Sequence, residues 1–210
     1  MFLLDFFLSA PLFGVLISLV FLFFPFAEVS NQYSPKAIGT VHLFTLGILS
    51  MIIFGAMQQM MPVLASAIIK KPKLFANIVH PSLVLGTLFM SFSFILELRF
   101  FLHIGVLFLS IAFFTFFTVS IRLLFKVEFL TSTVKAMRLF SVAGVITLIL
   151  GLIIAISHIT LNFSTHYYSF VNMHMLFGLF GFALLLIMGV SFQVIPMFYV
   201  ALDFPKYVQN

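Results

Sequence analysis

The six histidines are the residues of this chain with the clearest capacity for chemistry. An imidazole can ligate iron, copper or zinc, or transfer a proton near neutral pH. The chain has no cysteine, which excludes disulfides, thiolate metal sites and covalent haem attachment through a CxxCH motif. Any bound metal must therefore be held by His, Met or carboxylate. The histidines are His42, His80, His103, His158, His166 and His174.

Long apolar runs must position these histidines. Hydrophobic residues make up 63% of the 210 residues and charged residues 7%, whereas soluble domains carry about 25% charged residues. A helix crosses the hydrocarbon with about 20 apolar residues, and the alternating strands of a barrel do not occur. We expect an all-α integral membrane bundle of six transmembrane helices in a single domain, residues 1–210. The predicted helices are 6–27, 38–66, 79–96, 100–123, 136–158 and 170–200.

Lysine and arginine in the short loops predict the orientation, because they concentrate on the cytoplasmic side. One face carries Lys70, Lys71, Lys73, Arg122, Lys126, Lys135, Arg138 and Lys206, and the opposite connections carry only Lys36 and Arg99. The predicted topology is N-in and C-in, in a multi-pass protein of the inner (cytoplasmic) membrane. The net charge of +5 then faces anionic lipid, and nucleic acid is not an expected partner.

This orientation places five histidines at the outer leaflet and only His80 inside. His42 and His174 lie at matching depth, about one turn inside the outer ends of the parallel second and sixth helices. A histidine within a membrane helix indicates a functional site by default, because an unpaired polar group there costs free energy. One turn from the interface a single imidazole also reaches water, so the clustering of several favours function. His80, beside Pro81 at the predicted start of helix three, suits an interfacial or capping role.

Glycines share helix faces with two of these histidines. At 100° per residue, Gly178 and Gly181 lie on the face of His174. They either let another helix approach closely or make room for a flat macrocycle beside a ligating imidazole, and packing is the commoner explanation. On the fifth helix, His158 follows Gly151 by seven residues and so shares its face. His158 is therefore a third candidate metal-binding residue.

Predicted helices two and six share the pattern G-x7-G-x3-Q-x2-P. Its residues are Gly47, Gly55, Gln59 and Pro62 in one helix, and Gly181, Gly189, Gln193 and Pro196 in the other. Because both helices run from outside to inside, the pattern predicts a parallel internal repeat. Convergent helix packing is the alternative. The histidines are not in exact register, because His42 precedes its second glycine by thirteen residues and His174 by fifteen.

The segment VHLFTLGILSMIIFGAMQQMMPVL resembles the second transmembrane helix of heme-copper oxidase subunit I and its relatives, including nitric oxide reductases and the NnrS family. The matching residues are His42, Gly55, Ala56 and Pro62. The segment NMHMLFGLFGFALLLIMGVSFQVIPMF is similar to short proteins related to that superfamily through His174, Gly178, Gly189, Val190 and Pro196, with Asn172 in place of a first His. The resemblance implies haem ligation by His42, with His174 as a candidate second ligand.

The resemblance also has a limit that bears on activity. The oxygen-reducing centre of that superfamily needs copper held by several histidines, including an adjacent pair, and this chain has no His-His dipeptide. Catalytic subunits of the superfamily are also longer. A complete oxidase is therefore not expected, and no catalytic residue is assigned.

Three functions follow from these residues. The leading hypothesis is a b-type haem protein that passes electrons or assists a respiratory complex, with His42 and His174 holding iron from opposite faces. The second is a copper-handling protein, because thioether and imidazole suit Cu(I), although Met is also a general gap-filler. The methionines concerned are Met57, Met60, Met61, Met173 and Met175. The third is a cofactor-free assembly or structural membrane subunit. The expected partners are the lipid bilayer, respiratory-complex subunits or a second copy of the chain.

Overall fold

In the computed structural model, which describes residues 3–202, 204–205 and 207, helices occupy all the predicted spans. Six helices within this part of the chain are long and apolar enough to cross a membrane. They confirm the predicted all-α class and identify the chain as a polytopic helical membrane protein. Lys206, one of the charges used to predict the orientation, lies outside the described residues.

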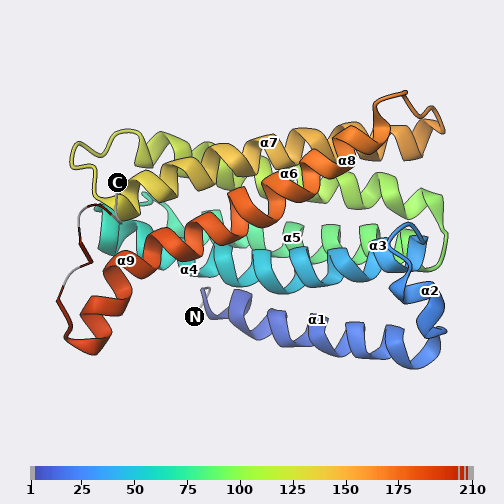
Figure 1. The fold of residues 1–210 in the computed structure, drawn as a ribbon, viewed down its shortest axis with the longest axis horizontal. Coiled ribbons are helices and arrows are strands. Elements are labelled where there is room, and N and C mark those ends of the chain that lie inside the picture. Colours follow the sequence, from blue (N-terminus) through green and yellow to red (C-terminus); the bar gives the residue numbers. More distant parts are fainter. Residues whose placement is uncertain (1–2, 203, 206, 208–210) are drawn as a thin grey trace. The chain divides into compact units, whose positions relative to one another are not determined.

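The α-helices of these six spans are labelled in Figure 1. The first span is α1 (Leu4–Phe23), and the short α2 (Phe26–Ser30) follows it. The second consists of α3 (Pro35–His42), the π-helical segment η1 (Leu43–Ser50) and α4 (Met51–Ala65). Then come α5 (Pro72–Ile95), α6 (Arg99–Leu124) and α7 (Ser132–Thr160). The sixth consists of α8 (Tyr167–Leu176), the π-helical segment η2 (Phe177–Leu184) and α9 (Leu185–Tyr199).

Two helix ends differ from the sequence expectation because of proline. The first helix ends at Phe23 and not at residue 27, since Pro25 forces the preceding residue into an extended conformation. The third helix begins at Pro72 and not at residue 79. Proline is favoured at the first helical position, and it is tolerated inside membrane helices. His80 therefore lies about two turns inside α5, and its predicted place at the helix start is wrong.

The chain divides into two compact units. Unit 1 comprises Met1–Gln59, Lys71–Phe116 and Ala155–Phe163, and unit 2 comprises Met60–Lys70, Phe117–Ile154 and Ser164–Asn210. His42, His80, His103 and His158 thus belong to unit 1, whereas His166 and His174 belong to unit 2. The two leading candidate ligands therefore belong to different units.

In unit 1, α1 lies antiparallel to η1, and α5 packs against α3 and η1 (Figure 1). Glycine allows the approach of α1. A Cβ at Gly55 would lie 2.9 Å from the Cβ of Phe6, and a Cβ at Gly47 would overlap the side chain of Phe13. Phe54 stacks on Phe116 with ring centroids 3.7 Å apart. Small residues therefore set the distance between helices, and phenylalanines fill the interior.

Unit 2 contains a second antiparallel seam of the same kind, between α7 and the η2–α9 helix. A Cβ at Gly181 would lie 2.7 Å from the Cβ of Ala143, and a Cβ at Gly189 would overlap that of Ala136. The Thr133 hydroxyl donates a hydrogen bond to the carbonyl of Gly189, at 3.0 Å. The close approach thus brings a side-chain donor within reach of the facing backbone.

The two seams match in detail. The segments η1 and η2 are both eight residues long, and α4 and α9 are both fifteen. Gly47 and Gly181 each occupy the fifth position of their π-helical segment. The facing residues are seven apart in both units, Phe6 and Phe13 in unit 1, Ala136 and Ala143 in unit 2. These matched bounds and contacts support the parallel repeat, which stays a prediction.

Substitution of Gly189 tests the seam of unit 2. We expect Gly189→Ala to lower the free energy of unfolding by about 1–3 kcal/mol, because the added methyl overlaps Ala136 in a packed interface. Thermal unfolding in detergent provides the measurement. Gly14→Ala is the matched control, since its Cβ would lie an ordinary 3.9 Å from Ile48. Equal stability of the two variants would contradict the close packing.

Candidate functional site

His42 is the last residue of α3 and directly precedes η1. The helix begins after Ser34, whose hydroxyl caps it by accepting a hydrogen bond from the amide of Ala37 at 3.0 Å. The half-buried His42 ring donates from Nδ1 to the carbonyl of Ile38 at 2.8 Å. Because a carbonyl only accepts, Nδ1 carries the proton and Nε2 carries the lone pair of the neutral ring. That tautomer is the one a metal bound at Nε2 requires.

Phe94 brings two of the predicted metal-binding histidines to one ring within unit 1. The ring of His42 lies parallel to Phe94, with centroids 6.5 Å apart and an interplanar angle of 14°. His158, near the end of α7, meets the same ring edge-on at 5.3 Å, and also meets Phe163 at 5.4 Å. The two half-buried imidazoles therefore share an aromatic neighbour. The role of His158 as a metal ligand stays a prediction.

His174 lies in α8 and is anchored to α7 within unit 2. Its Nδ1 donates to the carbonyl of Thr147 at 3.0 Å, so that in the neutral ring Nε2 again carries the lone pair. Gly151 provides the room, since a Cβ there would lie 3.0 Å from Cε1 and 3.4 Å from Nδ1 of His174. The sequence placed Gly151 on the face of His158. In the structure it is also the residue that admits the ring of His174.

Gly178 and Gly181, the other predicted cofactor contacts, face α7. A Cβ at Gly178 would lie 3.4 Å from the Thr147 methyl group, and a Cβ at Gly181 would lie 2.7 Å from the Cβ of Ala143. Close helix approach, the commoner explanation offered by the sequence, therefore accounts for both glycines. Their contact with a macrocycle stays a prediction.

A polar cluster around His80 was missed by the sequence analysis. Its Nε2 is hydrogen-bonded to the hydroxyl of Ser9 on α1, at 2.8 Å. A cavity of about 330 Å³ beside it is lined by Asp5, Ala76, Asn77, His80 and Pro81. The sequence carried a signal for this cluster, because Asp5 and Ser9 are four residues apart, and Asn77 and His80 are three apart. Each pair shares a helix face, but their meeting depends on how the helices pack.

The remaining candidate residues are spread through the chain. His103 and His166 are exposed, and Nδ1 of His103 bonds to the carbonyl of Arg99 at 3.3 Å. The side chains of Met57 and Met61 are fully buried, whereas Met173 and Met175 are about half exposed. Across residues 3–202, 204–205 and 207, no three or more His, Cys, Asp or Glu side chains form a metal-binding group. Within these residues, no imidazole belongs to such a group.

Removal of the Ser9 hydroxyl tests the link between α1 and α5. We expect Ser9→Ala to lower the free energy of unfolding by about 0.6–2 kcal/mol, because His80 loses its partner inside a membrane helix pair. Ser18→Ala on the same helix is the matched control, since that hydroxyl bonds only to the carbonyl of Gly14 one turn earlier. If the two variants unfolded alike, the link would not stabilise the unit.

Comparison with models of protein families gave no match, and comparisons with curated proteins and with solved structures gave none either. The likeness of two helices to heme-copper oxidase subunit I therefore rests on the residues quoted for it. Any function assigned to the chain must rest on the chemistry of its own histidines.

Proposed function

We propose that this chain is a b-type haem-binding integral membrane protein in which His42 and His174 would be the residues that ligate haem iron. The observation that carries the proposal is the state of these two rings. Each bonds through Nδ1 to a backbone carbonyl, so that in the neutral form of the ring Nε2 is the nitrogen that would ligate a metal. Metal-ligating histidines almost always have such an outer partner, which fixes the tautomer and raises the basicity of the ligating nitrogen.

The place of the two rings in their helices adds support. His42 directly precedes η1, and His174 lies three residues before η2. π-helical turns are rare and are frequently found at functional sites. The shared position beside a π-helical segment supports a common role for the two rings. The matched seams of the two units are consistent with a related role for the two histidines.

The chain's own residues have distinct tasks in this proposal. The carbonyls of Ile38 and Thr147 orient the two imidazoles, and Gly151 leaves room for the ring of His174. The ring of Phe94 lies parallel to that of His42, with centroids 6.5 Å apart. When bound, a haem with two imidazole ligands supplies reversible one-electron transfer.

The cellular setting is part of the same proposal. An N-in and C-in protein of the inner (cytoplasmic) membrane would hold both histidines near the outer surface. It would serve as an electron-transfer or accessory component beside respiratory-complex subunits or a second copy of itself, related to heme-copper oxidase subunit I without its copper centre. The lipid bilayer is an expected partner because six helices are long and apolar enough to cross it.

Visible spectroscopy tests the cofactor and its ligands. We expect the purified protein, expressed with adequate haem supply, to give a reduced-minus-oxidised b-type spectrum. His42→Ala and His174→Ala should each lose most of the haem per protein, because one nitrogen that would ligate the iron is removed. His103→Ala is the control, since it deletes an exposed imidazole with the same kind of bond to a carbonyl.

The outcomes separate the alternatives. A preparation without a haem band would refute the proposal, and a band unchanged in both ligand variants would refute the assignment of the ligands. Metal analysis of the same samples then distinguishes the copper-handling protein from the cofactor-free subunit. Size-exclusion profiles of the variants identify any loss of haem caused by misfolding.

A smaller change tests His174 without deleting it. We expect Gly151→Ala to shift the haem midpoint potential or lower haem content, because the added methyl would press on Cε1 and Nδ1 of the ring. Redox titration followed in the visible region is the measurement, with Gly14→Ala as the matched control. Identical potential and haem content in both variants would argue against iron at His174.

A further inference from the structure

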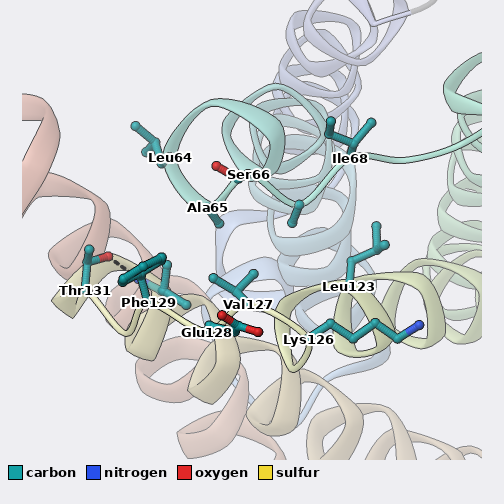
Figure 2. A pocket seen from close by; sticks show the side chains of 12 residues that line it. Leu64, Ala65, Ser66, Ile68, Leu123, Lys126, Val127, Glu128, Phe129 and Thr131 are labelled. Carbon is teal, nitrogen blue, oxygen red and sulfur yellow. Dashed lines mark hydrogen bonds between the residues drawn. The ribbon is translucent and has the colours of Figure 1, made fainter.

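A cavity of about 410 Å³ opens in unit 2 where α4 and α6 end and α7 begins (Figure 2). The loop at residues 66–68 forms one side of it, and the loop at residues 126–131 forms the other. Neither the histidines nor the glycine seams contribute to its lining. The cavity is therefore separate from the proposed haem ligands.

The lining combines apolar walls with a few polar groups. Leu64, Ile68, Leu123 and Val134 are among the apolar lining residues. Ser66, Lys126, Glu128 and Thr131 supply hydroxyl and charged groups, and Figure 2 shows Lys126 and Glu128 on the same loop. Such a lining suits an amphiphile, with its apolar part against the walls and its polar part at the loops.

The position of the cavity along the spans corresponds to the depth of lipid headgroups. The candidate spans end at Ala65 and at Leu124, and the next begins at Ser132. All three ends contribute neighbouring residues to the lining. Since helix ends mark the boundary between hydrocarbon and water, a phospholipid headgroup is the amphiphilic group available at this level.

Arg138 holds one wall of the cavity in place. Its guanidinium donates to the carbonyl of Leu124 at 3.0 Å and to that of Val127 at 2.6 Å, and it lies 5.0 Å from the ring centroid of Phe125. The loop is thus fixed without help from the charges on either side of Val127. In the part of the chain that the structure describes, Lys126 and Glu128 are exposed and take part in no ion pair.

We propose that this cavity binds the headgroup of a zwitterionic phospholipid that carries a primary ammonium group, as in phosphatidylethanolamine. Lys126 would pair with the lipid phosphate, and Glu128 would accept hydrogen bonds from the ammonium group. Adjacent charges of opposite sign match a headgroup with the same two charges. An anionic headgroup or free phosphate would gain from Lys126 but meet repulsion from Glu128. Phosphatidylcholine has the same charges, but its quaternary ammonium donates no hydrogen bond.

Native mass spectrometry of the full chain measures the preference. Phosphatidylethanolamine, phosphatidylcholine or phosphatidylglycerol, each with identical acyl chains, is added to the wild-type protein in detergent. The protein is then released from the detergent in the spectrometer, and the fraction that carries bound lipid is measured. We expect about fivefold tighter binding of phosphatidylethanolamine, corresponding to about 1 kcal/mol for one charged contact at the membrane surface. Glu128→Gln should bring phosphatidylethanolamine down to the level of phosphatidylcholine. Lys126→Gln should weaken both zwitterionic lipids.

Lys135→Gln is the matched control, because this exposed lysine follows the same loop without lining the cavity. It should bind all three lipids as wild type does. Equal binding of the three lipids by wild type, or an unchanged preference in Glu128→Gln, would overturn the proposal. Competition by inorganic phosphate would also overturn it, because it would show that phosphate alone is recognised. The substituted side chains are exposed, and size-exclusion profiles confirm that each variant is folded.

Discussion

Hydrocarbon offers no water to pair with backbone groups, and this constraint governs the whole molecule. Every span is helical, and several of its hydroxyl groups bond back to a carbonyl one turn earlier, as those of Thr45, Ser110, Ser141 and Thr147 do. The hydrogens of these hydroxyl groups are then not available to link helices. Links within a unit include those of Ser9 with His80, Thr133 with Gly189, and His174 with Thr147. The links of Thr133 and His174 lie where a glycine lets another helix approach closely.

The position of His174 depends on one of the side-chain hydrogen bonds that link two helices. Its ring reaches a carbonyl of another helix only because Gly151 leaves the space, so the same close packing that stabilises unit 2 also fixes the imidazole. His42 is held differently, by a carbonyl of its own helix and by the face of Phe94. Two distinct local arrangements thus give the same tautomer. That convergence in chemistry is stronger support for a ligand role than the histidines' depth alone.

Hydropathy and length predicted the spans well, because a run of about 20 apolar residues between charged residues is typical of a transmembrane helix. The start of α5 was missed, since a lysine-rich stretch looks like a loop although Pro72 is a good first residue of a helix. The partners of His80 and His174 could not be predicted from one sequence. Both lie on a neighbouring helix, and their contact depends on the rotation of that helix, which no residue spacing reveals.

The π-helical segments change which residues of the second and sixth spans lie on the same face of the helix. Hydrogen bonds from i to i+5 turn the chain less per residue than an α-helix does. Residues before and after η1 or η2 are therefore out of rotational phase with a regular helix. A glutamine such as Gln58, buried in α4, is offset in azimuth from where a 100° wheel begun at His42 would put it. A single unbroken span can consequently direct its N-terminal half toward one neighbour and its C-terminal half toward another.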